Sequence, residues 1–132
     1  MTAKRIEAIE TSGAPIPNVP LAQATRYGDI VFTSGQVAND PVTGEFVGSG
    51  IEIETRRVLD NLTAVLDAAG SSIDRVLKAT VFLTDVDDFA AFNSVYETYF
   101  PDRLPARSTF VVKLAGPFKV EIELVAAVKE NA

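Results

Sequence analysis

The chain has 132 residues, a formal net charge of −6, and neither histidine nor cysteine. Without these two residue types it can form no disulfide, thiolate nucleophile or Ser-His or Cys-His catalytic pair, and it lacks the commonest zinc ligands. The negative charge argues against a nucleic-acid-binding protein, because such proteins gain affinity by neutralising phosphates. If the chain is an enzyme, its proton transfers must therefore use Asp, Glu, Lys, Tyr or ordered water.

The organisation of the chain predicts a single domain over residues 1–132. Hydrophobic residues make up 47% of the sequence, enough for a buried core, and no repeat, low-complexity segment or linker divides it. No apolar run approaches the ~20 residues of a membrane-spanning helix. Residues 1–11 contain a Lys-Arg pair with no apolar segment behind it, so no signal peptide is predicted. We therefore expect a cytoplasmic protein that does not bind membranes.

The first third of the chain predicts two short strands separated by irregular segments. Residues 6–10 (IEAIE) favour a short strand, and the three prolines of residues 13–20 favour an irregular loop. A turn at residues 27–29 precedes a β-prone run at residues 30–33. Residues 39–44 are rich in turn formers and predict another loop.

The middle of the chain predicts a helix, a strand and a second helix. Between Gly50 and Ala69, apolar residues recur at the spacing of one helical face, and Gly70 supplies a C-terminal stop. The recurring positions are Val58, Leu62, Val65, Leu66 and Ala69. Residues 75–83 become continuously apolar and predict a central strand. The second helix begins near Asp85 and ends at Pro101.

Two strands complete the chain, at residues 108–114 and 118–128. The resulting order, β-β-α-β-α-β-β, predicts an α+β domain in which two helices pack on one face of a mixed sheet. Two helices can cover only one side of the sheet. Residues 110–112 and 124–128 nevertheless lack a clean polar face for the other side. The uncovered face therefore predicts an oligomer.

The segment LPARSTF, residues 104–110, places an arginine at the start of a predicted strand. Pro105 fixes its own φ and restricts Leu104, so the backbone entering Arg107 is pre-shaped. A guanidinium group held in this way can bind a carboxylate through two parallel hydrogen bonds. The alternative is a surface arginine paired with a nearby Asp or Glu.

Three other polar positions are candidates for a site. Glu121 shares a strand face with Glu123, and enclosure beside apolar surface would raise its pKa and suit it to activating water; otherwise it is a charge on a solvated face. Gly35, after Ser34, either allows close approach of a ligand or belongs to a plain turn. Asn93, on the second predicted helix, could donate its amide to a ligand or satisfy a neighbouring loop.

Taken in order and spacing, the motifs resemble the Rid family (reactive intermediate deaminases, also called the YjgF family), from about Pro20 to Val128. The matching segments are Ser34-Gly35-Gln36, Asp40-Pro41-Val42-Thr43-Gly44, Asp60-Asn61-Leu62, Ala68-Ala69-Gly70, the run from Lys78 to Asp85, Asp88-Phe89, Asn93-Ser94-Val95-Tyr96, Tyr99-Phe100, Pro105-Ala106-Arg107-Ser108 and Val120-Glu121-Ile122-Glu123. The resemblance implies a chorismate-mutase-like α+β fold and a homotrimer with clefts between neighbouring subunits.

The resemblance also implies an activity. Family members of the main type hydrolyse 2-imino acids, such as 2-iminopropanoate or 2-iminobutanoate, to 2-keto acids and ammonia, and need no cofactor or metal. These imines and enamines leak from pyridoxal-phosphate enzymes, so the reaction limits metabolite damage. By position, Arg107 would bind the substrate carboxylate, and its partner Glu121, on the following strand, would activate water. Ser34 and Gly35 would shape the pocket, and Asn93 would support its polar network.

Two positions depart from the family pattern. Leu21 stands where deaminase-type members usually carry Tyr, and Thr109 stands where they often carry Cys. Because Leu21 has no hydroxyl, the pocket is expected to be more apolar on one side. Two alternatives therefore stay open: a hydrolase or deaminase acting on another carboxylated metabolite, as in aminomuconate or aminoacrylate breakdown, or a non-catalytic trimer that binds a small carboxylate. A ribonuclease role fits poorly with the net charge and the lack of histidine.

Overall fold

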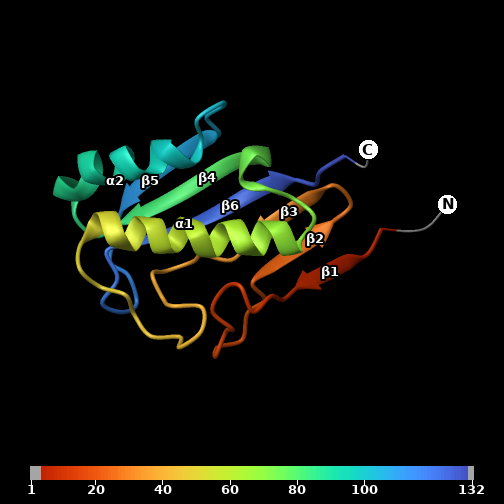
Figure 1. The fold of residues 1–132 in the computed structure, drawn as a ribbon, viewed down its shortest axis with the longest axis horizontal. Helices are drawn as coiled ribbons and strands as arrows, with labels where there is room; N and C mark the ends of the chain where they lie inside the picture. Colours follow the sequence, from red (N-terminus) through yellow and green to blue (C-terminus); the bar gives the residue numbers. More distant parts are fainter. Residues whose placement is uncertain (1–3, 131–132) are drawn as a thin grey trace.

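A single mixed sheet is the centre of the fold, which a computed structural model describes for residues 4–130 (Figure 1). Its strands are β1 (Ile6–Ile9), β2 (Ala24–Tyr27), β3 (Ile30–Thr33), β4 (Val76–Leu83), β5 (Ala106–Val111) and β6 (Val120–Ala127). Their spatial order is β1-β2-β3-β6-β4-β5. Only β4 and β5 pair in parallel, and α2 (Phe89–Tyr96) connects them. The arrangement confirms the predicted α+β class.

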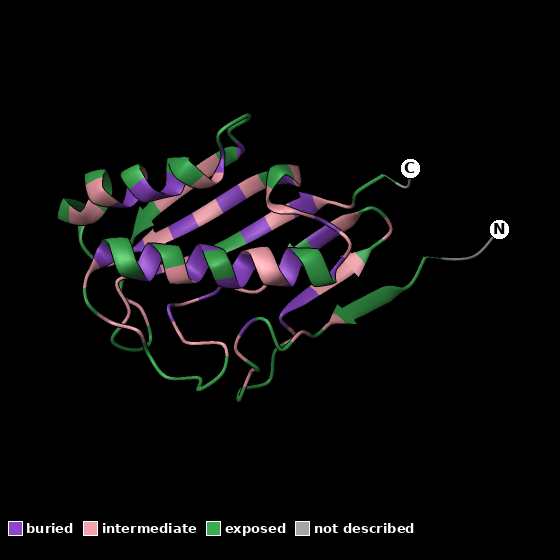
Figure 2. Ribbon diagram, in the orientation of Figure 1, coloured by how far each residue is buried: buried purple, intermediate pink, exposed green. Residues whose placement is uncertain are grey.

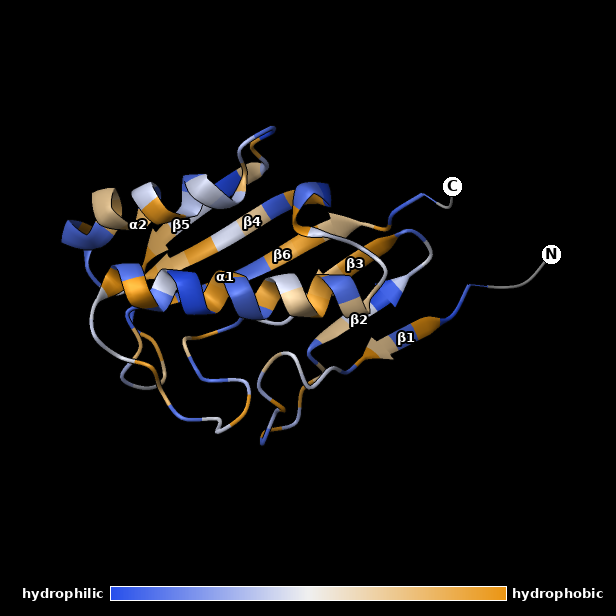
Figure 3. Cartoon of the chain, in the orientation of Figure 1, coloured by the Kyte–Doolittle hydropathy of each residue, from blue (hydrophilic) through white to orange (hydrophobic). Residues whose placement is uncertain are grey.

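Both helices lie on the same face of the sheet, as predicted (Figure 1). The longer helix is α1 (Ile51–Ala68). Buried and exposed residues alternate along it because its apolar residues share one side (Figures 2 and 3). The shorter helix, α2, lies between two 3₁₀ turns, Val86–Asp88 and Glu97–Tyr99. Asp85 caps the first of these turns by accepting a hydrogen bond from the backbone N–H of Asp87 at 2.9 Å. No helix within residues 4–130 is long and apolar enough to span a membrane.

The hydrophobic core fills the space between the helices and the sheet. Along β6, every second residue is buried, which is the period expected of a strand with one covered face. Its buried side chains pack with those of α1 and β4. The contributors include Leu59, Leu62 and Leu66 from α1, Val81 and Leu83 from β4, and Ile122 and Leu124 from β6.

The opposite face of the sheet, which we call the open face, carries no helix among the described residues (Figure 1). Phe32 and Phe110 lie on it and are 50% and 51% exposed. Phe110 stacks on Phe82 with the ring centroids 6.1 Å apart. Glu121 and Glu123 share this face, as the strand alternation predicts. Exposed aromatic surface of this kind favours contact with another protein surface.

The structure corrects two parts of the predicted element map. The sequence pattern indicates five strands, whereas residues 4–130 form six; the additional strand is β2, a four-residue segment, ATRY, with no apolar run to mark it. The strand predicted at residues 108–114 begins two residues earlier and ends at Val111. It starts early because Ala106 already lies in register with Lys78 of β4.

Candidate functional site

Arg107 lies on β5, at the edge of the sheet, on the face that α2 covers. Its register partner on β4 is the buried Ala79, which faces the helices. The guanidinium carbon lies 4.8 Å from the ring centroid of Tyr96, 5.5 Å from that of Phe92 and 5.7 Å from that of Phe89. The aromatic side chains of α2 therefore fix the arginine from one side, and its N–H groups remain available to a ligand.

A cavity of about 400 Å³ opens beside Arg107. Asn93, Tyr96 and Pro105 are among the residues that line it. The Oδ1 atom of Asn93 and the hydroxyl of Tyr96 are buried and have no hydrogen-bond partner within the described residues. Burial raises the pKa of Tyr96 and the charge of Arg107 opposes this rise, so the hydroxyl is protonated and can donate at neutral pH. These unpaired groups are suited to a small polar ligand, since leaving a buried polar atom unpaired costs about 1–3 kcal/mol.

Glu121 lies on the open face, directly against Gly35. A Cβ atom at Gly35 would approach the Cδ atom of Glu121 to 2.8 Å, so the position has no room for a side chain. Two backbone hydrogen bonds fix this approach: the N–H of Gln36 donates to the Ile122 carbonyl at 2.9 Å, and the N–H of Ile122 donates to the Gln36 carbonyl at 3.2 Å. Gly35 thus permits the close packing that encloses the glutamate.

The environment of Glu121 raises its pKa. Burial is the largest cause, and the negative charge of Glu123 on the same strand face adds to it. Both effects disfavour the ionised carboxylate. A carboxylate of raised pKa is a better proton acceptor, which is the property that a general base requires.

Ser34 connects Glu121 and Gly35 to the segment that contains Leu21. The hydroxyl of Ser34 donates to the carbonyl of Ala22 at 2.6 Å, and its N–H donates to the carbonyl of Gln23 at 2.9 Å. Leu21 is 47% exposed. Its side chain can therefore contact a ligand or a second protein surface.

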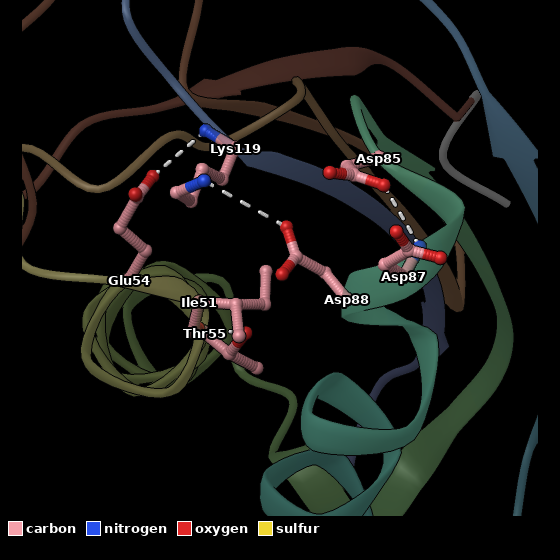
Figure 4. A network of polar contacts seen from close by, with 7 residues as sticks. All are labelled: Ile51, Glu54, Thr55, Asp85, Asp87, Asp88 and Lys119. Carbon is pink, nitrogen blue, oxygen red and sulfur yellow. Dashed lines mark hydrogen bonds and ion pairs between the residues drawn. The ribbon is translucent and has the colours of Figure 1, made fainter.

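A partly buried polar network holds the start of β6 two residues before Glu121 (Figure 4). The Oε1 atom of Glu54, a buried residue of α1, accepts a hydrogen bond from the N–H of Lys119 at 2.9 Å. The Nζ atom of Lys119 lies 3.9 Å from the Oδ2 atom of Asp88, beside the start of α2. Burial raises the pKa of Glu54, and its contacts with Lys119 oppose this rise. The network joins both helices to β6 and so fixes the strand that carries Glu121.

Arg107 and Glu121 lie on opposite faces of the sheet. Their strands do not touch, because β4 lies between β5 and β6. Arg107 is in register with Ala79 of β4, and Glu121 is in register with Phe82. These two partners are three positions apart on β4, and side chains an odd number of positions apart in a strand point to opposite faces. Within one chain Arg107 and Glu121 therefore do not face one another, and the expected partnership stays a prediction that needs a cleft between two subunits.

The candidate residues thus form two groups, which we name half-sites. The arginine half-site contains Asn93, Tyr96, Arg107 and Thr109; Thr109 lies on the same strand face as Arg107, two residues along. The glutamate half-site contains Ser34, Gly35 and Glu121. Leu21, a candidate from the sequence, is not brought to it and instead lines a separate cavity beside β1. Among residues 4–130, no three acidic side chains come together as a metal site would require.

Tyr96 is the residue that the sequence pattern did not indicate as part of a site. Its helical spacing with Phe92 places it in an apolar stripe, and the structure does bury its ring. The additional signal is its position one turn after Asn93, which brings both polar groups to the same side of α2, beside Arg107. A tyrosine three residues after a candidate polar contact therefore counts as a second candidate.

Comparison with known proteins identifies the family. The family model described as endoribonuclease L-PSP matches residues 11–128. A RutC family protein of Pyrococcus horikoshii is 45% identical over 121 residues, 91% of this chain and 96% of that protein. The 2-iminobutanoate/2-iminopropanoate deaminase of Mus musculus is 40% identical over 121 residues, 91% of this chain and 90% of the mouse protein.

A solved structure shows the same fold. The crystal structure of Escherichia coli TdcF with bound serine superposes with a TM-score of 0.88 at 38% identity, covering 93% of this chain and 99% of that one. Its topology is thus that of the described chain over nearly the whole length. On the strength of the family model, the curated relatives and this shared fold, the chain belongs to the endoribonuclease L-PSP family, the YjgF or Rid family.

Proposed function

We propose that the chain hydrolyses reactive 2-imino acids and their enamines to 2-keto acids and ammonia, at clefts between the subunits of a homotrimer. The observation that carries this proposal is the separation of Arg107 and Glu121 onto opposite faces of one sheet. A second copy that packs on the open face can bring its own arginine half-site to the glutamate half-site of the first. The exposed Phe32 and Phe110 on that face supply the apolar surface for such packing.

In this mechanism, Arg107 binds the substrate and transfers no proton. Its fork pairs with the two oxygens of the substrate carboxylate, and its stacking on Tyr96 limits its motion. The hydroxyl of Tyr96 donates a further hydrogen bond to the carboxylate, and Oδ1 of Asn93 accepts one from the N–H of the imine. The electrophilic carbon is thereby held in front of the glutamate half-site of the neighbouring copy.

Glu121 then acts as the base. The imine nitrogen takes a proton from solvent before the attack. The Glu121 carboxylate takes a proton from water as the water oxygen attacks the iminium carbon, and the electron pair of the C=N bond moves to nitrogen. The protonated Glu121 next gives this proton to the amine of the carbinolamine. The C–N bond breaks with its electron pair on nitrogen, ammonia leaves, and the hydroxyl oxygen forms the carbonyl as its proton passes to Glu121 and then to solvent. The name of the mouse relative supports this reaction class.

The direct test uses 2-iminopropanoate generated in the assay by an amino-acid oxidase. Wild-type protein is expected to accelerate ammonia release above the rate in buffer, which a coupled spectrophotometric assay measures. No acceleration with several such imines would favour the non-catalytic alternative, a small-carboxylate binder. That alternative is consistent with a relative, TdcF, whose crystal structure has bound serine.

A second candidate function is hydrolysis or deamination of another carboxylated metabolite. The exposed, apolar Leu21 favours it, because this position offers no hydroxyl where deaminase-type relatives usually carry a tyrosine. The family model's name refers to ribonuclease activity, which fits this chain poorly: a net charge of −6 repels RNA, and there is no histidine for acid–base cleavage.

Removal of the Tyr96 hydroxyl is expected to separate stability from ligand binding. Because the hydroxyl is buried without a partner, Tyr96→Phe should leave the melting temperature unchanged or slightly raised. The inhibition constant of pyruvate, a carboxylate product, should rise by roughly tenfold to a hundredfold, the value of one hydrogen bond to a charged group. Thermal melts and product-inhibition kinetics check the two results.

The matched control is Tyr99→Phe, which removes a hydroxyl that binds Asp60 outside the cavity. Equal inhibition constants in wild type and Tyr96→Phe would contradict a hydrogen bond from the Tyr96 hydroxyl to the ligand.

The pH dependence of kcat/KM is expected to report Glu121. Because the pKa of Glu121 is raised, activity should fall with decreasing pH at a higher pH than an ordinary glutamate would give, as the base becomes protonated. The charge of Glu123 contributes to this rise, so Glu123→Gln should move the acid limb of the profile to lower pH. Initial rates between pH 4 and 8 measure the limb. An unchanged or upward shift in Glu123→Gln would show that Glu121 is not the titrating base.

A further inference from the structure

A second cavity lies at the end of the sheet where α1 and β6 both finish. Its volume is about 730 Å³, and it shares no lining residue with the cavity beside Arg107. Backbone hydrogen bonds bring its walls together: the N–H of Val128 donates to the carbonyl of Asp29 at 2.8 Å, and that of Lys129 donates to the carbonyl of Gly70 at 2.9 Å. Figure 1 shows the end of α1, the turn between β2 and β3, and the end of β6 gathered there.

Three cationic side chains line this cavity: Arg26, Arg75 and Lys129. None of them forms an ion pair within residues 4–130, where the single pair within 4.0 Å joins Lys119 to Asp88. The cavity therefore gathers three cations without an ion-pair partner among the described residues, in a chain whose net charge is −6.

Both arginines are fixed by backbone carbonyl groups. Arg26 donates from Nε to the Gly28 carbonyl at 3.1 Å and from Nη1 to the Ala69 carbonyl at 3.2 Å, beside the C-terminus of α1. Arg75 donates from Nη2 to the Val128 carbonyl at 3.2 Å. The guanidinium groups are thus held in place, as a binding site requires.

These contacts leave guanidinium donors unused. The Nε atom of Arg75 is buried and has no hydrogen-bond partner among the described residues. A buried, charged N–H without a partner carries a desolvation cost that a bound acceptor would remove. Arg75 therefore lines the cavity with a positive charge and with a donor that no described group satisfies.

Acidic side chains are also present around the cavity. Asp29 and Glu130 line it, and both are exposed. Asp74 lies near its rim; a hydrogen bond from Ser72 is the largest cause of its lowered pKa, and the charges of Lys129 and Arg75 add to it. The last two contributions show that Lys129 and Arg75 lie near enough to act on a neighbouring anionic group.

We propose that this cavity binds a small phosphate-bearing anion, either inorganic phosphate or a phosphate monoester, on Arg26, Arg75 and Lys129. A single carboxylate presents two oxygens in one plane and satisfies one guanidinium fork. A phosphate presents oxygens in several directions, so it can accept from two guanidinium groups and an ammonium group at once. The site is independent of the proposed deaminase chemistry, because none of its residues belongs to either half-site.

The test measures inorganic phosphate binding by isothermal titration calorimetry in low-salt buffer. All proteins carry Arg107→Ala, so that the arginine half-site cannot contribute a second anion site. Adding Arg75→Gln should weaken binding by about tenfold to a hundredfold, the effect of losing a charge-assisted contact. Adding Lys129→Gln, which keeps the backbone bond to Gly70, should weaken it less and reduce its dependence on salt.

The matched control is Arg103→Gln, an exposed arginine that also donates to backbone carbonyls, those of Asp74 and Val76, but does not line the cavity. It should bind phosphate as its parent does. The proposal is overturned if the parent binds no phosphate at millimolar concentration, if acetate binds equally well, or if Arg75→Gln and Lys129→Gln both leave binding unchanged. Because the parent already lacks Arg107, none of these results depends on the deaminase proposal.

Discussion

Replacing Arg107 with alanine is expected to reduce kcat/KM for 2-iminopropanoate by roughly a hundredfold to a thousandfold, the value of two charge-assisted hydrogen bonds to the substrate carboxylate. The substrate then loses the group that holds its electrophilic carbon near water. Steady-state kinetics with freshly generated imine measure the loss. Size-exclusion chromatography should show an unchanged assembly, since the apolar surface proposed to hold the subunits together comes from Phe32 and Phe110 and not from Arg107.

Arg107→Lys separates charge from geometry. Lysine keeps the positive charge but has no planar fork, so we expect most of the activity to be lost in this variant as well. The matched control is Arg103→Ala, which removes an arginine outside both half-sites. Full activity in Arg107→Lys would contradict bidentate binding, and full activity in Arg107→Ala would remove the arginine from the mechanism altogether.

The helices and strands were predictable where apolar residues recur at one regular spacing over many residues. The apolar face of α1 repeats over five turns, and the alternation in β6 extends over eight residues, so both elements were recognised from the sequence. The strand β2 was not, because its four residues include Arg26 and contain no apolar run. Pairing with β1 and β3 on both sides gives this segment its conformation. Such tertiary contacts leave no local pattern to read.

The candidate site was predictable in its residue types and not in its grouping. Pro105 has a fixed φ and precedes an arginine, and in the structure it lines the cavity beside Arg107. Gly35 has no side chain, and in the structure it packs against Glu121. The relation between Arg107 and Glu121 depends on strand order and register instead. The position of β4 between β5 and β6 separates the two residues, and no local pattern specifies that strand order.

Mixing two inactive variants is expected to restore activity if the half-sites meet between subunits. One variant carries Arg107→Ala and the other carries Glu121→Gln, and each should be nearly inactive alone. After refolding together at equal amounts, a cleft is complete only when its arginine comes from the Glu121→Gln chain and its glutamate comes from the Arg107→Ala chain. Random assembly gives about a quarter of the clefts this composition, so about a quarter of wild-type specific activity should return.

Two comparisons make this result decisive. The same variants mixed without refolding should stay inactive, because their subunits have not exchanged. Refolding Arg107→Ala with the double variant Arg107→Ala/Glu121→Gln should also restore nothing, since no chain in that mixture supplies an arginine. Native mass spectrometry verifies that mixed assemblies have formed. If they have formed and activity stays at the level of the single variants, Arg107 and Glu121 do not complete one another across a subunit boundary, and the opposite faces on which they lie would then exclude a shared active site.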